Sequence, residues 1–262
     1  MSGQIPREIA ADLSRARRLE WWTLFWMGTV VVVMFLAMGS SQAMRTALVE
    51  DVLSLVPAIV FLITSRLEGK APTRPFPYGF HRVHSLAFLI SAVALTAVGS
   101  LLLFESAMTL VRQEHVTIPP VTLFGQHVWM GWVMVAALLY SFVPPMILGR
   151  MKLPIAKRLQ DEVLHTDAMM QKADWMTAHG RAAGVIGLGL GFWWADATAA
   201  MLISGSILKD GIGALRSSTA ELIDGAPREL EGVELSSEGE ALKRALHRRY
   251  PGAEVRLRET GR

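Results

Sequence analysis

Long apolar stretches separated by short polar segments dominate the chain. Five of them read directly as spans: about Trp22–Gly39, Thr46–Ser65, Val83–Val111, Val121–Leu148 and Ala197–Leu215. Each is long enough for a helix to cross the hydrocarbon core, which takes roughly 20 residues. A further helix is predicted between Lys157 and Trp193, where a polar run leads into the apolar, Gly-rich stretch Ala182–Gly191. The pattern predicts an all-α membrane protein with six transmembrane helices.

The distribution of basic residues predicts how these helices are oriented. Arg and Lys gather before the first span, in the 66–82 loop, in the tail and in the 150–158 segment, which carries Arg150, Lys152, Lys157 and Arg158. The opposite turns carry mainly Arg45 and Arg112. Because cytoplasmic loops are enriched in basic residues, we expect both termini and the 150–158 cluster to face the cytoplasm.

Three regions follow from this reading. Residues 1–20 form a cytoplasmic N-terminal lead-in, residues 21–215 the six-helix membrane domain and residues 216–262 a cytoplasmic C-terminal segment. The last contains a predicted helix at about Gly239–Arg249, a turn at Pro251-Gly252 and a strand-like stretch, Ala253–Arg258. We therefore expect a short α/β tail.

Composition narrows the class of protein. The chain is 52% hydrophobic and only 19% charged, which is too apolar for a soluble domain of 262 residues. The net charge of +3 does not indicate nucleic-acid binding, because the basic residues lie beside apolar spans. The absence of cysteine excludes thiolate catalysis, disulfides and Cys-ligated zinc. With no nucleophile–base motif and no cofactor loop, we expect neither an enzyme nor a bound cofactor.

The polar run at residues 165–174 is the first candidate site. On a helix it has two polar faces: Asp167, Met170, Gln171 and Asp174 share one, and His165, Lys172 and His179 share the other. Ionisable groups inside a membrane helix usually face one another, a cavity or an ion path. The alternative is that the helix begins in water and these groups are solvated.

A second polar anomaly lies near one end of the second span. Glu50 and Ser54 are four residues apart and share a helix face, whereas Asp51 is rotated by about 100°. These side chains are candidates for the same buried site. The alternative is that both acids lie in water at the outer interface.

The order of motifs resembles the cation diffusion facilitator family over nearly the whole chain. The resemblance rests on Pro77-Tyr78-Gly79 and Arg82, an acid within each of the second and fifth spans, Trp194-Ala195-Asp196, and Glu221-Leu-Ile-Asp224. It implies a homodimeric, proton-coupled exporter of a divalent cation of the zinc, iron or manganese class. It also implies six helices per subunit, a cytoplasmic ferredoxin-like domain, and contact with lipid in a cell membrane, here a bacterial inner membrane.

The resemblance carries a metal site onto particular residues. Two helices of the family each supply two ligands spaced four apart, and the matching positions here are Glu50, Ser54, Met170 and Asp174, with Asp51, His165 and Asp167 as substitutes if a helix is rotated. Serine is a poor zinc ligand and a thioether a soft one. The alternative reading is therefore a transport-defective member that acts as a structural or regulatory partner in a membrane complex.

Three further expectations follow from the resemblance. Arg82 and Asp224 match a charged pair that interlocks helices at the family's dimer interface. The segment Leu242–Gly261 resembles only the first helix and strand of the ferredoxin-like domain, so that domain is incomplete. Lys172 argues against a plain metal site unless it pairs with Glu50 or Asp51, because a cation close to the ligands repels the metal ion.

Overall fold

The computed structural model describes residues 7–37, 49–68, 70–80, 82–113, 120–123, 126–189, 192, 194–230 and 234–258. Its long helices are α1 (Arg7–Ala37), α3 (Val56–Leu67), α4 (Arg82–Arg112), α5 (Met130–Leu159), α6 (Glu162–Gly189) and α7 (Ala195–Leu222). A further helix, α8 (Ser237–Arg249), follows them. Strands β1 (Pro120–Leu123) and β2 (Gln126–Trp129) pair as an antiparallel hairpin, and residues 49–54 are also helical.

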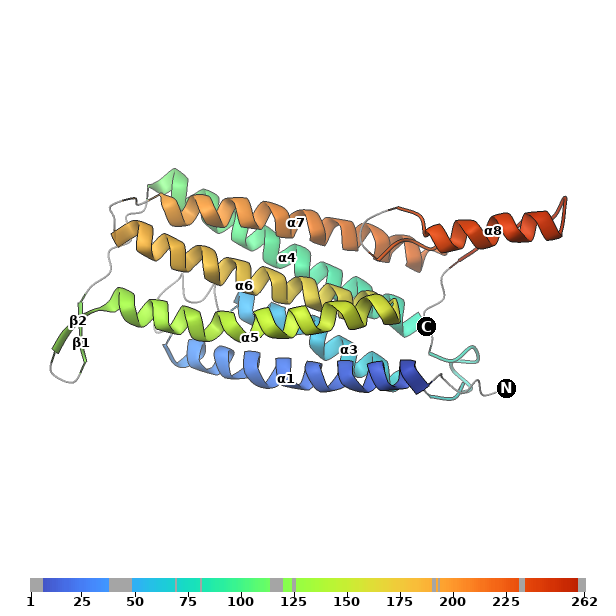
Figure 1. Ribbon diagram of the computed structural model, residues 1–262, viewed down its shortest axis with the longest axis horizontal. Coiled ribbons are helices and arrows are strands. Elements are labelled where there is room, and N and C mark those ends of the chain that lie inside the picture. Colours follow the sequence, from blue (N-terminus) through green and yellow to red (C-terminus); the bar gives the residue numbers. More distant parts are fainter. Residues whose placement is uncertain are drawn as a thin grey trace.

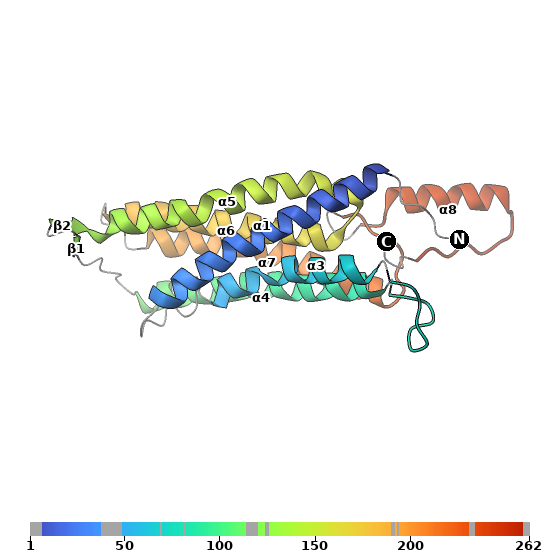
Figure 2. The ribbon, with the colours of Figure 1, turned by 90° about the horizontal axis from the view of Figure 1, so that it is seen from below.

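The long helices form an elongated bundle. Helix α4 packs along α7, α5 along α6, and α6 also contacts α7, while α3 lies against α4, α6 and α1 (Figure 1). Figure 2 shows α1 running obliquely between α5 and α3, both of which it contacts. The start of α1 and helix α8 lie at one end of the bundle, and the hairpin lies at the other. The two described ends of the chain therefore share one end of the fold.

Helices α4 and α7 approach each other closely because glycine lies at two crossing points. A Cβ atom at Gly99 would lie 2.9 Å from the backbone nitrogen of Leu208, and one at Gly211 would lie 2.9 Å from the backbone of Thr96. Neither space accepts a side chain without a shift of backbone. The pair is thereby fixed as one unit, against which α6 packs.

The predicted fold class is confirmed in its coarse form: the described chain is mostly helical. By length and composition, α4 is the one helix of the described residues that is long and apolar enough to cross a membrane. The prediction of one helix between Lys157 and Trp193, with the polar run as its first half, agrees with α6. The predicted boundaries after residues 20 and 215 fall inside α1 and α7.

The predicted span Val121–Leu148 is wrong over its first part. Residues 120–129 form the hairpin, and helix α5 begins only at Met130. The β-branched residues of this stretch, including Val121, Thr122 and Val128, favour an extended chain, and hydropathy counts them as apolar in either conformation. The helix then continues through Pro144, Pro145 and Pro154 to Leu159, beyond the predicted end.

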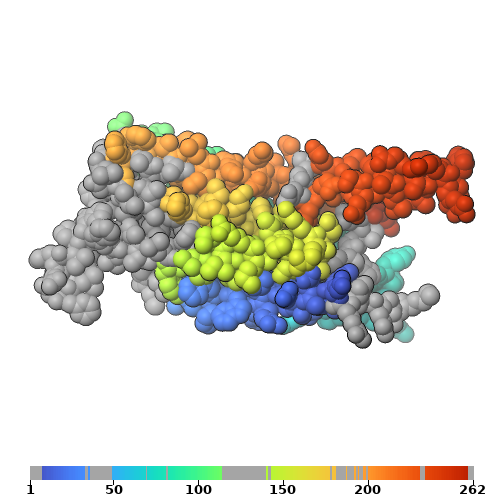
Figure 3. All heavy atoms as spheres, in the orientation of Figure 1, coloured from blue at the N-terminus to red at the C-terminus, as the bar shows by residue number. Residues whose placement is uncertain are grey.

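The tail contains the expected helix but not the expected strand. Helix α8 begins after Ser236, whose side chain accepts a hydrogen bond from the Gly239 amide at 3.2 Å. Residues 253–258 have no regular structure after the turn at Gly252, which adopts φ +90°. A strand is stable only beside another, and no described strand lies next to this stretch. Helix α8 projects beyond the bundle (Figure 3).

Candidate metal centre

The structure joins the two polar anomalies of the sequence by a hydrogen bond. Ser54 Oγ donates to Asp174 Oδ1 at 2.8 Å, which connects the helical turn at 49–54 to the middle of α6. That turn ends at Leu55, two residues before Pro57. Proline has no backbone N–H and therefore cannot donate a hydrogen bond to the preceding turn. Ser54 is fully buried. The neighbouring acid Glu50, one helical turn away, is buried as well.

Asp174 has unused coordinating capacity. Its second oxygen, Oδ2, is buried and has no hydrogen-bond partner within the described part of the chain. A buried carboxylate oxygen without a partner is unfavourable. A cation, a proton or a water molecule at this oxygen would satisfy it.

Met170 completes the proposed ligand set but packs in an apolar environment. It is fully buried in a cluster with Leu95, Val98 and Ile207. Leu53, from the same helical turn as Ser54, packs against this cluster. Over the residues that the structure describes, no three His, Asp or Glu side chains converge as a metal site would require. The matched positions thus bring one hydrogen-bonded carboxylate, one hydroxyl and one thioether to neighbouring turns.

The substitute ligands have other surroundings. Asp167 forms an ion pair with Lys152, and His165 lines a cavity on the other side of α6. Asp51 is half-buried on the 49–54 turn. Asp167 and His165 therefore do not join the Ser54–Asp174 contact.

Lys172 pairs with an acid that the sequence analysis did not consider. Its ammonium lies 3.7 Å from Asp210 of α7, rather than beside Glu50 or Asp51. On α6, Lys172 is two residues from Asp174 and therefore points roughly 200° away from it. The repulsion that the sequence suggested between this lysine and a bound cation is thereby relieved.

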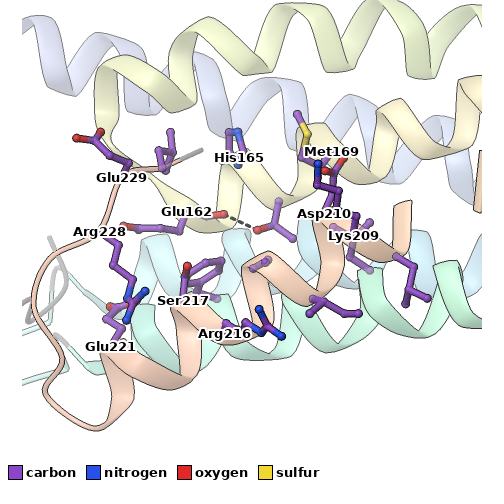
Figure 4. A pocket seen from close by; sticks show the side chains of 18 of the residues that line it. Glu162, His165, Met169, Lys209, Asp210, Arg216, Ser217, Glu221, Arg228 and Glu229 are labelled. Atoms are coloured by element: carbon purple, nitrogen blue, oxygen red, sulfur yellow. Dashed lines mark hydrogen bonds between the residues drawn. The ribbon is translucent and has the colours of Figure 1, made fainter. Parts of the chain in front are cut away.

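That opposite face of α6 borders a cavity of about 960 Å³ between α6, α7 and the segment after α7. Figure 4 shows Glu162, His165 and Met169 of α6 facing Asp210 and Ser217 of α7 across it. Its wall carries both acidic and basic side chains, among them Glu162, Lys209 and Arg216. No residue of the Asp167, Met170, Gln171 and Asp174 face lines it, so the cavity does not open onto the Ser54–Asp174 contact.

Lys152 departs from the expectation that the whole 150–158 cluster faces the cytoplasm. Its side chain is completely buried between α1, α5 and α6, where the ammonium donates to Glu20 Oε2 at 2.8 Å and to Thr23 Oγ1 at 2.6 Å. It also pairs with Asp167. Glu20, assigned from the sequence to the cytoplasmic lead-in, is therefore part of the bundle interior.

The sequence analysis also missed the role of His84. This buried side chain bridges two acids, with Nδ1 3.0 Å from Glu68 and Nε2 2.9 Å from Glu162. Its neighbour Ser85 donates to Glu221 at 2.6 Å. The sequence held one signal for this role, namely a histidine inside a predicted span together with acidic residues near the ends of two other predicted helices.

Arg82 and Asp224 pair within one chain. Arg82 also donates to the Leu222 carbonyl at 3.1 Å, and Arg258 lies 3.3 Å from the same aspartate. Asp224 ends α7 with φ +62°. The hydrogen bond from Arg82 lowers the pKa of Asp224 below its usual range. The pair ties the start of α4 to the end of α7, and its role between subunits stays a prediction.

Sequence comparison with known proteins identifies a family and relatives for this chain. The pattern described as the cation efflux transmembrane domain matches residues 23–223. A probable cation efflux system protein of Mycobacterium tuberculosis is 24% identical over 198 residues, which is 75% of this chain and 55% of that protein. The manganese efflux system protein MneS of Bacillus subtilis is 22% identical over 185 residues, 71% of this chain and 60% of that protein. The chain thus matches little more than half the length of these relatives.

Proposed function

Because this chain belongs to the cation efflux family, whose members are transporters rather than enzymes, we propose that it exports a divalent metal cation in exchange for protons. The proposed cation site lies between the 49–54 helical turn and α6, with Glu50, Ser54, Met170 and Asp174 as ligands. The observation that carries this proposal is the Ser54–Asp174 hydrogen bond, which joins the two matched positions of the family site across 120 residues of sequence.

The proposed assembly is a homodimer of six-helix subunits in a cell membrane, with both termini in the cytoplasm. The start of α1 and helix α8 at one end of the bundle support the shared side of the termini. The Arg82–Asp224 pair supports the proposed interlocking of helices at the dimer interface, since the pair lies where α4 and α7 meet at that same end.

The donor atoms favour a hard cation. Glu50, Ser54 and Asp174 would all bind through oxygen, whereas zinc sites in proteins are usually built from cysteine and histidine. Within the zinc, iron and manganese class, manganese fits an oxygen-rich set best. One relative is named for manganese efflux. We therefore propose Mn²⁺ as the preferred cargo.

Calorimetry on the purified protein tests the site. We expect Mn²⁺ to bind the parent protein and to lose all measurable binding to Asp174→Ala. Asp210→Asn is the matched control, because Asp210 is a carboxylate that pairs with α6 on the face turned away from Asp174. Equal loss of Mn²⁺ binding in both variants would refute the assignment of Asp174 to the cation site. It would show that removing any acid from the helix bundle impairs binding.

A restoring substitution tests the identity of the two weak ligands. Ser54→Asp with Met170→His supplies an additional carboxylate and an imidazole to the same turns, which is the chemistry zinc prefers. We expect this double variant to gain zinc affinity relative to the parent. Unchanged zinc affinity would show that these positions do not contribute to one site.

The packing of Met170 favours a second candidate function. Its burial among Leu95, Val98 and Ile207 is what a residue with a purely structural role would show. In that case the chain keeps the family fold as a partner in a membrane complex without transporting metal. Absence of Mn²⁺, Fe²⁺ and Zn²⁺ binding to the parent protein, together with binding to the restored double variant, would favour this function.

A further inference from the structure

Four buried side chains from three helices form a polar cluster inside the bundle, which we call the Lys152 cluster: Glu20 and Thr23 of α1, Lys152 of α5 and Asp167 of α6. All four are completely buried. The three protons of the Lys152 ammonium have three acceptors, because it contacts Glu20, Thr23 and Asp167. Thr23 in turn donates to the Leu19 carbonyl at 3.1 Å. The ammonium is therefore fully satisfied in its charged form.

The carboxylates are not satisfied. With both ionised, the cluster carries two negative charges against one positive charge, a net charge of −1 buried away from water. Glu20 Oε1 and Asp167 Oδ1 are buried and have no hydrogen-bond partner among the residues described. A single added proton neutralises the cluster and turns one carboxyl into a donor. The same proton can belong to either acid, because both contact one ammonium.

A metal ion is a poor alternative occupant. Any cation at the two free oxygens would lie close to the Lys152 ammonium, which bridges the same two carboxyl groups. Two positive charges at such distances repel strongly where the surroundings are apolar. A proton forms a covalent bond to oxygen and leaves no second ion in the cluster. The geometry thus selects a proton.

The other ion contacts described for α1 bring no countercharge to Glu20, and the buried Nε of Arg17, one turn before it, has no hydrogen-bond partner in the described chain. Among the described contacts of α1, Arg158 of α5 pairs with Asp12, on an exposed part of the helix surface. Arg66 of α3 lies 5.9 Å from the ring of Trp21, on the side that faces out of the bundle. Within the cluster, the charges that face Glu20 are those of Lys152 and Asp167.

The cluster continues along α6 toward the candidate metal centre. Asp167, Gln171 and Asp174 follow one helix face, and Asp174 lies about 10 Å from Asp167 along the axis. Gln171 is completely buried, and both atoms of its amide lack a partner in the described chain. Gly149 of α5 leaves room for it, since a Cβ there would lie 3.0 Å from the Gln171 Cβ. Unpaired polar atoms thus line the whole interval.

We propose that the Lys152 cluster is a proton-binding site separate from the metal centre, in which Glu20 and Asp167 share one proton while Lys152 stays charged. Gln171 connects this site to Asp174. The existence of the proton site rests on the cluster alone. Its coupling to cation binding rests on the proposed function, because it requires a cation at Asp174 to repel the shared proton.

Infrared difference spectroscopy of the full-length protein in lipid tests the proton site. At neutral pH the parent should show the carbonyl signal of a protonated carboxyl group from this cluster. Glu20→Gln and Asp167→Asn should each abolish that signal, because either change leaves one carboxylate balanced by one ammonium. Asp12→Asn, on the exposed surface of the same helix α1, is the control and should leave it intact. An unchanged signal in both cluster variants, each shown to be folded by size exclusion, would overturn the proposal.

Proton release on addition of Mn²⁺ tests the coupling. A pH indicator in weak buffer should report that the parent releases one more proton per subunit than Glu20→Gln does. Equal release from a Glu20→Gln variant that still binds Mn²⁺ would overturn the coupling. If the parent binds no Mn²⁺, the proposed function fails, and the infrared signal alone still decides whether the cluster holds a proton.

Discussion

Replacing Lys152 should expose how strongly the bundle depends on its buried charges. Lys152→Met keeps a long side chain of similar shape but removes the ammonium that contacts Glu20 and Asp167. The two carboxyl groups would then remain buried without their positive partner. Breaking a buried ion pair in this way typically destabilises a protein by about 3–5 kcal/mol. For a chain of this size, that corresponds to a fall in melting temperature of about 6–20 °C.

The assay is thermal unfolding of the purified protein in detergent, followed by tryptophan fluorescence. Arg158→Met is the control, because Arg158 pairs with Asp12 across the same two helices but on the exposed surface. Such exposed pairs contribute little, so this variant should unfold close to the parent. Adding Glu20→Gln and Asp167→Asn to Lys152→Met should recover most of the lost stability, because no unpaired charge then remains. Equal melting temperatures for Lys152→Met and Arg158→Met would refute the reasoning.

Other parts of the fold make equally specific predictions. Gly211→Ala should destabilise the protein, since its Cβ would meet the α4 backbone, whereas Gly213→Ala, with nothing within 4 Å, should be neutral or stabilising in the same melting assay. Because Arg82 lowers the pKa of Asp224, the contribution of this pair is complete above the ordinary aspartate pKa of about 3.9 and lost as pH falls through the lowered value. The difference in melting temperature between the parent and Arg82→Ala should therefore shrink in acid, toward the part that the hydrogen bond from Arg82 to the Leu222 carbonyl contributes, and a constant difference would contradict this. A cysteine placed at Lys70 in this Cys-free chain should resist an impermeant thiol reagent added outside intact cells, and labelling from outside would reverse the proposed topology.

Periodicity along α6 was enough to group Asp167, Gln171 and Asp174 on one face, because a helix fixes which residues align. It could not say which face meets which helix. The contact between Ser54 and Asp174 spans 120 residues, and it was reached only through the family resemblance. The polar run was predicted to form the first half of a membrane helix, and the structure makes it the first half of α6.

Lys152 shows why charge counting failed where it did. The positive-inside rule counts every lysine near a span toward the cytoplasmic side, whether or not its side chain is buried. Burial of this lysine depends on Glu20, which is 132 residues away, and on Asp167, which follows on the next helix. No local pattern reports such neutralisation. The prediction for the segment that forms β1 and β2 failed for a related reason, since hydropathy does not distinguish an apolar strand from the start of a span.

Transport by the reconstituted protein tests the central proposal most directly. Mn²⁺ uptake into proteoliposomes should be driven by an imposed pH gradient for the parent and for Asp210→Asn. It should fall to the level of protein-free liposomes for Asp174→Ala, because that change removes the buried carboxylate proposed to hold the cation. Undiminished, gradient-driven Mn²⁺ uptake by a folded Asp174→Ala variant would contradict the account.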